Sequence, residues 1–263
     1  MDMAQTNIAG NYAVVNGLKM YYEIHGEGFP LVLIHGGGSD IGVTFGRVLS
    51  SFAKNHQVIG VDLQAHGRTP DRGVPTSFEQ DADDVAVLLK QLDIKQADIM
   101  GFSNGGNTAM QVAIRHPQLV HKIVIASSFY KRSGFDDWFW DFMKNATLDS
   151  MPKPLQDAFL AINNDQAALE VMHKRDLHRM QAFQDWSDDA IRSITMPALV
   201  IAGDKDVIRP EHTLELFRML PDAQLCILPA GHGDYIGEIE DRRGDGDYPA
   251  VAIIEEFLTK TKA

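Results

Sequence analysis

Cysteine is almost absent from this sequence. Among 263 residues there is one, Cys226. A single thiol excludes an internal disulfide framework and a cysteine-based metal site, and it is typical of proteins from a reducing compartment. Cys226 lies in a short apolar run, so we expect its side chain to fill space in a strand.

Basic residues are scarce relative to acidic ones. The chain has 24 Lys and Arg against 36 Asp and Glu, which gives a formal net charge of −12. Nucleic acids and anionic membranes are bound mainly through clustered Lys and Arg, so this balance argues against both as partners. A small neutral or apolar molecule is the expected partner.

Long apolar runs are also missing, and we expect no leader sequence. No run approaches the roughly 20 apolar residues of a membrane-spanning helix, and residues 1–10 lack the basic and apolar regions of a signal peptide. With 44% hydrophobic residues in 263, the chain can bury a substantial core. We expect one cytoplasmic domain that carries an insertion, and the sequence is compatible with a homo-oligomer.

The sequence does contain a regular alternation of strand-like and helix-like segments. Asn16-Gly17 between two β-rich runs, 12–15 and 18–24, predicts an antiparallel hairpin. Apolar runs typical of strands buried on both faces follow at 31–34, 57–61, 97–100, 122–126, 198–202 and 224–228. Helical patterns follow at 42–54, 76–92, 104–115, 210–220 and 250–258, the second opened by a capping box of Thr76 and Glu79. This order predicts an α/β fold with a mostly parallel, doubly wound sheet.

The alternation breaks once, from residue 129 to residue 195. This stretch is helix-like throughout and carries a dense aromatic segment at 135–143. We interpret 129–195 as a helical cap inserted over the sheet, which leaves 1–128 and 196–263 as the core. Four aromatic side chains of the cap either line an apolar pocket or form the cap's own core, and the sequence does not separate the two: Trp138, Phe139, Trp140 and Phe142.

One stretch combines strand, sharp turn and helix with a serine at the tip: Gly101-Phe102-Ser103-Asn104-Gly105. A nucleophile held at a strained strand-to-helix turn tolerates almost no bulk at the flanking positions, and Gly101 and Gly105 meet that need. The alternative is an ordinary glycine-rich turn. The pattern favours Ser103 as a nucleophile.

A second glycine-rich loop, His35-Gly36-Gly37-Gly38, directly follows the apolar run 31–34. Three glycines let the backbone approach a ligand and present its N–H groups, so the loop could cradle an oxyanion. The spacing matches neither common nucleotide-binding glycine motif, which disfavours a phosphate loop.

A serine hydroxyl needs a base, and the base needs a carboxylate to fix its tautomer. Because ligands bind at the carboxyl ends of strands in open α/β sheets, the partners should follow core strands. Asp206 and His232 do so in the chain order serine, acid, histidine. Asp204 is the neighbouring alternative to Asp206.

Taken together, these motifs resemble the α/β-hydrolase superfamily over nearly the whole chain. The resemblance implies a Ser103, Asp206 and His232 triad, since family members often carry the acid in a G-x-x-D-x-x-x-P frame that Gly203, Asp206 and Pro210 match. It also implies that the backbone N–H groups of Gly37 and Asn104 form the oxyanion hole, with no metal or organic cofactor. His35 and His66 are then structural hydrogen bonders.

The resemblance implies a serine hydrolase that cleaves a small, largely apolar ester or lactone through an acyl-enzyme. The alternatives are a C–C bond hydrolase of the meta-cleavage type, a cofactor-free haloperoxidase or perhydrolase, and a ligand-binding receptor on the same fold. The acidic segment 238–248 departs from the family pattern. We expect a solvated insertion there, with a lip of the site's mouth as the alternative.

Overall fold

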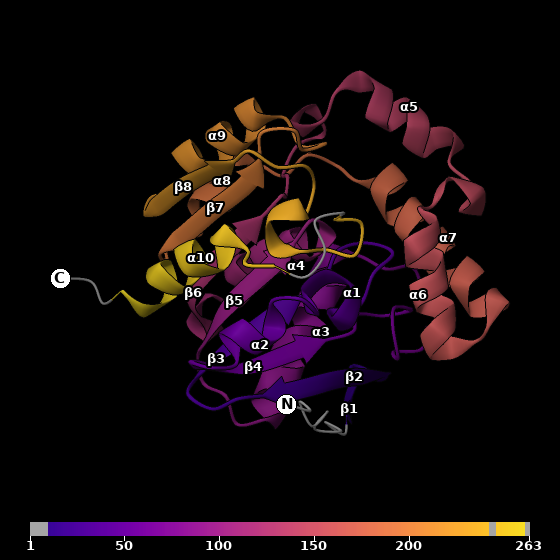
Figure 1. The fold of residues 1–263 in the computed structure, drawn as a ribbon, viewed down its shortest axis with the longest axis horizontal. Coiled ribbons are helices and arrows are strands. Elements are labelled where there is room, and N and C mark those ends of the chain that lie inside the picture. The colour runs from indigo at the N-terminus through magenta and orange to yellow at the C-terminus, as the bar shows by residue number, and fades with distance from the viewer. Residues whose placement is uncertain (1–9, 242–245, 261–263) are drawn as a thin grey trace.

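A computed structural model describes residues 10–241 and 246–260, and within these residues eight strands form one sheet (Figure 1). The strand order is β1-β2-β4-β3-β5-β6-β7-β8. Only β1 with β2 and β2 with β4 pair antiparallel, and the other neighbours pair parallel. The predicted α/β sheet with an antiparallel hairpin is confirmed. The strands are β1 Asn11–Val15, β2 Leu18–His25, β3 Phe29–Ile34, β4 His56–Val61, β5 Ala97–Phe102, β6 Val120–Ala126, β7 Ala198–Gly203 and β8 Ala223–Leu228.

The helices lie between and after the strands in the chain. Short 3-10 turns accompany them at Pro117–Leu119, Arg132–Gly134, Leu148–Ser150 and Asp234–Ile236. The α-helices are α1 Ile41–Phe45, α2 Leu49–Phe52, α3 Phe78–Gln91, α4 Asn104–Arg115, α5 Asp137–Asn145, α6 Lys153–Asn163, α7 Gln166–Ala182, α8 Asp188–Arg192, α9 Pro210–Met219 and α10 Pro249–Thr259.

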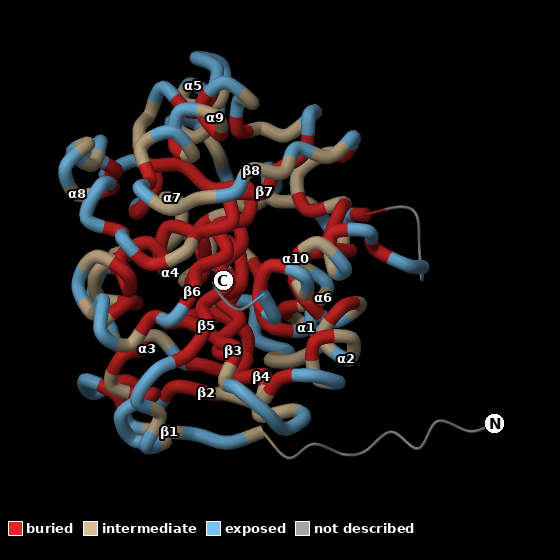
Figure 2. The backbone as a smooth tube through the Cα atoms, turned by 90° about the vertical axis from the view of Figure 1, so that its left-hand side faces the viewer, coloured by how far each residue is buried: buried red, intermediate tan, exposed pale blue. Residues whose placement is uncertain are grey.

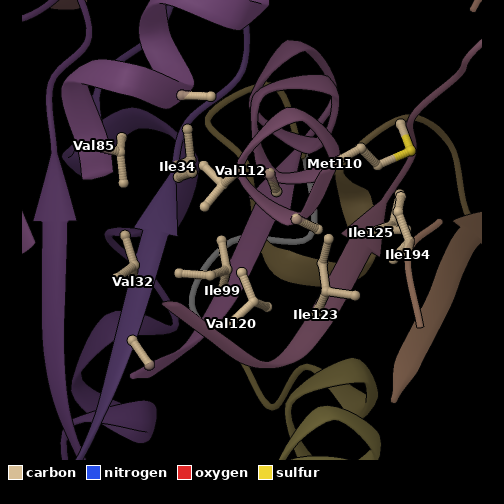
Figure 3. Packing of buried hydrophobic residues seen from close by; sticks show 14 of the residues in the cluster. Val32, Ile34, Val85, Ile99, Met110, Val112, Val120, Ile123, Ile125 and Ile194 are labelled. Atoms are coloured by element: carbon tan, nitrogen blue, oxygen red, sulfur yellow. The ribbon is translucent and has the colours of Figure 1, made fainter. Parts of the chain in front are cut away.

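Alternate residues of each central strand face opposite sides of the sheet, and each side has its own core. Figure 2 shows the buried strands β3, β5 and β6 with helices on both sides of them. Val32 and Ile34 pack with residues of α3, α4, α8 and α9, including Val85 and Met110 (Figure 3). The intervening Leu33 packs with residues of α1, α2 and α10. Helices on both faces of a parallel sheet make the fold doubly wound.

The segment between β6 and β7 is helical and departs from the alternation. Helix α7 packs against both α5 and α6, and the three lie beyond one end of the sheet in Figure 1. Helix α8 packs instead against α4 and α9, and Ile191 and Ile194 join the core on that face. The elements that cover the end of the sheet are therefore α5 to α7.

Two local expectations are wrong. The predicted helix 42–54 is two short helices, because α1 ends at its C-cap, Gly46, a residue that weakens a helix interior. Helix α3 is capped by Ser77 rather than Thr76: the Ser77 side chain accepts the Gln80 N–H, whereas the Thr76 hydroxyl donates to the carbonyl of Arg175.

The expected absence of a leader in residues 1–10 concerns a stretch of which 1–9 lie outside the described residues. Among the helices of the described ranges, none combines the length and the apolar character that a bilayer-spanning segment needs.

Replacing Ser77 by alanine tests the corrected cap. We expect Ser77→Ala to lower the free energy of unfolding by about 1 kcal/mol, because the Gln80 N–H loses its acceptor. Ser77→Asp, which keeps an acceptor, should unfold like the wild type in urea. A Ser77→Ala protein as stable as the wild type would contradict this assignment.

Candidate active site

The site forms at the edge of the sheet where the parallel strands end. β5 leads into Ser103, the loop after β7 carries Asp206, and the loop after β8 carries His232. Parallel strands have their carboxyl ends at one edge, so three residues distant in the sequence meet there. β3 ends at the same edge, in the loop 35–38.

Ser103 occupies a strained backbone position between β5 and α4. Its φ is 53° and its ψ is −122°, a combination that side-chain-bearing residues rarely adopt. A Cβ on Gly101 would lie 2.0 Å from the carbonyl oxygen of Gly105, and a Cβ on Gly105 would lie 2.2 Å from that of Ile34. Both glycines are therefore needed for the backbone to close this turn.

The structure brings Ser103, His232 and Asp206 into a hydrogen-bonded chain. The Ser103 Oγ lies 3.1 Å from the His232 Nε2, and the His232 Nδ1 lies 2.7 Å from the Asp206 Oδ1. A carboxylate only accepts, so Nδ1 carries a proton and Nε2 is free to accept from the serine hydroxyl. This arrangement can transfer the Ser103 proton to His232.

The Asp206 carboxylate is fully buried and accepts three hydrogen bonds. Besides His232 it accepts the Ile208 N–H at 3.0 Å and the Ser127 hydroxyl. Burial by itself would raise the pKa of Asp206, but His232 and these donors hold that pKa below its ordinary value. Asp204 instead accepts the Ala230 N–H at 3.0 Å, so it braces the loop and does not reach the histidine.

The pKa of His232 is raised above its ordinary value. Burial lowers it, but the charge and the hydrogen bond of Asp206 outweigh the burial, and Glu238 and Glu240 act in the same direction. Glu238 is itself buried, which raises its own pKa to about 7. Negative charge beside His232 thus stabilises the imidazolium that forms when the histidine takes a proton.

Gly37 and Asn104 both line the cavity in front of Ser103. Within the described residues, neither backbone N–H donates a hydrogen bond to another protein group. The two residues are close, since a Cβ on Gly37 would lie 2.6 Å from the Asn104 Nδ2. Their N–H groups are available to a ligand at the site.

A cavity of about 300 Å³ opens over Ser103 and His232. Its far wall comes from α5, α7 and the turn between α5 and α6, and it is mostly aromatic and aliphatic. Phe139 and Phe142 belong to this wall, whereas Trp138 and Trp140 do not. Trp138 is 57% exposed, and Trp140 packs under Arg132 and donates its indole N–H to the Arg132 carbonyl at 2.8 Å.

The expectation of a solvated insertion at 238–248 is wrong for its described beginning. Glu238 and Asp241 are buried, and Arg47 donates to the Asp241 carbonyl at 2.9 Å. Glu240 is exposed and lines the cavity. The start of the segment is therefore packed against the site's mouth, while residues 242–245 lie outside the described part of the chain.

His35 and His66 both form structural hydrogen bonds beside the site. Leu63 N–H donates to the His35 Nε2 at 3.0 Å, and the His35 Nδ1 donates to the Gly36 carbonyl at 2.7 Å. His35 is thus a neutral tie between two loops, and burial lowers its pKa to about 3. His66 lies 2.8 Å from a carboxylate oxygen of Asp176.

Sequence reasoning missed three residues at the site. Ser127 donates to Asp206 and lies 2.7 Å from the Tyr235 hydroxyl, which completes the buried surroundings of the acid. The position of Ser127 directly after a core strand was a usable signal. Asp176 lines the cavity from α7 and accepts the Gly38 N–H, but nothing in the local pattern of α7 distinguishes it from a surface acid.

No group of three or more histidine, cysteine, aspartate or glutamate side chains in residues 10–241 and 246–260 is arranged to hold a metal ion.

Comparison with protein-family models finds a match to the alpha/beta hydrolase fold over residues 30–148. The chain is 31% identical to the 2-hydroxymuconate semialdehyde hydrolase of Pseudomonas sp. (strain CF600), with 85% of this chain and 87% of that protein covered. It is 28% identical to the human serine hydrolase BPHL, with 86% and 80% covered.

Comparison with solved structures also finds the same fold. The enol-lactonase from Burkholderia xenovorans LB400 superposes with a TM-score of 0.72 and 24% identity, over 95% of this chain and all of that one. At that identity the likeness concerns the fold alone.

The negative charge around His232 can be tested by titration. We expect Glu238→Gln to lower the pKa of His232, because removing a nearby carboxylate destabilises the imidazolium. Histidine NMR during a pH titration measures this, with Glu256→Gln on the exposed side of α10 as the control that leaves the pKa unchanged. An unchanged or higher pKa of His232 in Glu238→Gln would contradict the assignment.

Proposed function

The chain belongs to the α/β-hydrolase family and is a hydrolase, and on that premise we propose that it cleaves small, largely apolar esters or lactones through an acyl-enzyme on Ser103. The observation that carries the proposal is the hydrogen-bonded chain from Ser103 through His232 to Asp206 at the floor of an apolar cavity. In this proposal helices α5 to α7 act as a cap within the segment 129–195, and 1–128 with 196–263 form the core.

The proposed reaction has two halves. The Ser103 Oγ attacks the acyl carbonyl carbon while its proton moves to the His232 Nε2, and the same proton then leaves with the alcohol as the C–O bond breaks. A water molecule next attacks the acyl-serine, gives its proton to His232, and the acid is released as Ser103 regains its hydrogen. Asp206 orients the imidazole in both halves.

The tetrahedral intermediate carries a negative oxygen that needs hydrogen-bond donors. The N–H groups of Gly37 and Asn104 suit this role because no protein acceptor among the described residues uses them. Asn104 N–H also belongs to the first turn of α4, where the helix favours negative charge. Each donor would lower the barrier by about 3 kcal/mol.

The cavity favours an uncharged acyl group. None of its described lining residues is Lys or Arg, and Glu240 contributes a carboxylate, while the Asp176 carboxylate is already paired with His66 and Arg179. A substrate carboxylate would lose its hydration there without gaining a cation. Phe139, Phe142 and Met172 offer apolar contact to an acyl chain.

The second candidate is hydrolysis of a C–C bond in a meta-cleavage product. It is favoured by the 31% identity to a 2-hydroxymuconate semialdehyde hydrolase. Products of that kind carry a carboxylate, which the described lining does not neutralise, so we place this reaction second.

A perhydrolase or haloperoxidase would use the same three side chains, and a receptor would not need His232 within 3.1 Å of the serine.

A substrate panel tests the reaction type. We expect the purified protein to turn over p-nitrophenyl acetate and butyrate and a neutral lactone, and Ser103→Ala to lose about 10³-fold or more of kcat. Turnover of a meta-cleavage diketone alone would overturn the ester assignment in favour of the second candidate. Ligand binding without turnover of any compound would favour the receptor.

A matched pair of aspartates tests the acid. Asp206→Asn should lower kcat by about 10⁴-fold, because the amide favours the wrong tautomer of His232. Asp204→Asn keeps the oxygen that accepts the Ala230 N–H and should retain kcat. Equal losses in the two variants, measured on the same ester, would refute the assignment of Asp206.

A further inference from the structure

Asp176 reaches from α7 to the loop proposed as part of the oxyanion hole. Its Oδ2 accepts the Gly38 N–H at 2.6 Å, and a Cβ on Gly37 would lie 3.1 Å from the same oxygen. Asp176 is separated from Gly38 by 138 residues in the chain. A carboxylate of the cap helix therefore fixes the peptide unit next to a proposed oxyanion donor.

This loop needs an external constraint. Residues 36–38 are three consecutive glycines, and Gly38 has a φ of +66°. Glycine adopts many backbone conformations, so the direction of the Gly37 N–H is not fixed by local sterics. The His35 hydrogen bond to the Gly36 carbonyl holds the peptide unit that carries the Gly37 N–H, and the charge-assisted hydrogen bond from the Gly38 N–H to Asp176 holds the peptide unit that follows.

His66 presents a positive charge to the same carboxylate. Its Nδ1 lies 2.8 Å from the Gln64 carbonyl oxygen, and its Nε2 lies 2.8 Å from the Asp176 Oδ2. Both partners only accept hydrogen bonds, so both ring nitrogens carry protons and the ring is an imidazolium. Asp176 outweighs the effect of burial and raises the pKa of His66.

Arg179, one helical turn after Asp176, completes a buried cluster of four charges. Its guanidinium donates to the Asp176 Oδ1 and to the Asp81 Oδ2, the second bond at 2.6 Å. Arg179 and Asp81 are buried. Two cations and two carboxylates sum to zero, so Asp176 can hold the loop without placing a net negative charge beside a developing oxyanion.

We propose that Asp176 is a positioning residue for catalysis: it holds the 36–38 loop so that the Gly37 N–H faces the oxyanion, and it makes the oxyanion hole depend on the docking of α7. His66 and Arg179 neutralise and orient Asp176. The proposal rests on the function proposed above, because it assigns a role within the same oxyanion hole.

The chain offers a matched control on the same helix. Arg175 forms a bidentate pair with Asp71, at 3.1 Å from its Nε to Oδ1 and at 2.7 Å from its Nη2 to Oδ2. This pair also ties α7 to the core, but it does not touch the loop 36–38. If Asp176 only stabilised the packing of α7, loss of the Arg175 pair should lower kcat as much as loss of Asp176 does.

The test compares Asp176→Leu, Asp176→Asn and Arg175→Gln with the wild type. The readouts are kcat and KM on p-nitrophenyl butyrate, the inhibition constant of a trifluoromethyl ketone that forms a tetrahedral adduct with serine, and the melting temperature. We expect Asp176→Leu to lower kcat and inhibitor affinity by about 10²-fold, the effect of losing one oxyanion donor, with KM much less affected. Asp176→Asn keeps an acceptor for Gly38 and should recover part of both.

Arg175→Gln should retain wild-type kcat and inhibitor affinity even where its melting temperature falls. The inference is overturned by wild-type kcat in Asp176→Leu, or by equal losses of kcat in Arg175→Gln and the Asp176 variants. If Asp176→Leu does not fold, Asp176→Asn with a kcat no lower than that of Arg175→Gln overturns it. If the wild type turns over no ester, the function proposed above is refuted. That result is distinguishable from the outcomes that overturn only the role of Asp176.

Discussion

The close backbone packing at residues 101–105 is the constraint on which the site depends. Gly101 and Gly105 approach neighbouring carbonyl groups so closely that a single added carbon at either position would overlap with them. That approach keeps Ser103 at a positive φ, with its hydroxyl oxygen 3.1 Å from the His232 Nε2. The surrounding sheet, buried on both faces, supplies the rigidity that maintains this strained turn.

Two aspartate–histidine pairs, Asp206–His232 and Asp176–His66, lie at the site, and they differ in what the second ring nitrogen of the histidine contacts. His232 faces a carboxylate with Nδ1 and the Ser103 hydroxyl with Nε2, so it can be neutral and accept a proton. His66 faces an acceptor with each nitrogen, so its protons are fixed and it cannot act as a base. We therefore assign proton transfer to the His232–Asp206 pair and loop positioning to the His66–Asp176 pair as proposals, on the basis of this difference in hydrogen-bond geometry.

The sequence predicts the parts of this structure that depend on local chemistry. The Asn16-Gly17 hairpin, the buried strands and the glycines around Ser103 each have a local sequence pattern. The structure brings Ser103, Asp206 and His232 within hydrogen-bonding distance of one another in a chain. Contacts between distant segments leave no such pattern: Asp176 meets Gly38 across 138 residues, and only the folded chain places α7 over the loop. The Ser77 cap was missed because Thr76 beside it has the same capping chemistry.

The proposed chemistry requires that Ser103 is a nucleophile activated by His232. The most direct measurement is the rate of labelling by a fluorophosphonate across pH, with the adduct located by peptide mass spectrometry. We expect a single adduct on Ser103 whose labelling rate rises with pH as His232 loses its proton, with a midpoint above the ordinary histidine pKa. An adduct on another residue, or a rate on Ser103 that does not follow the ionisation of His232, would contradict it.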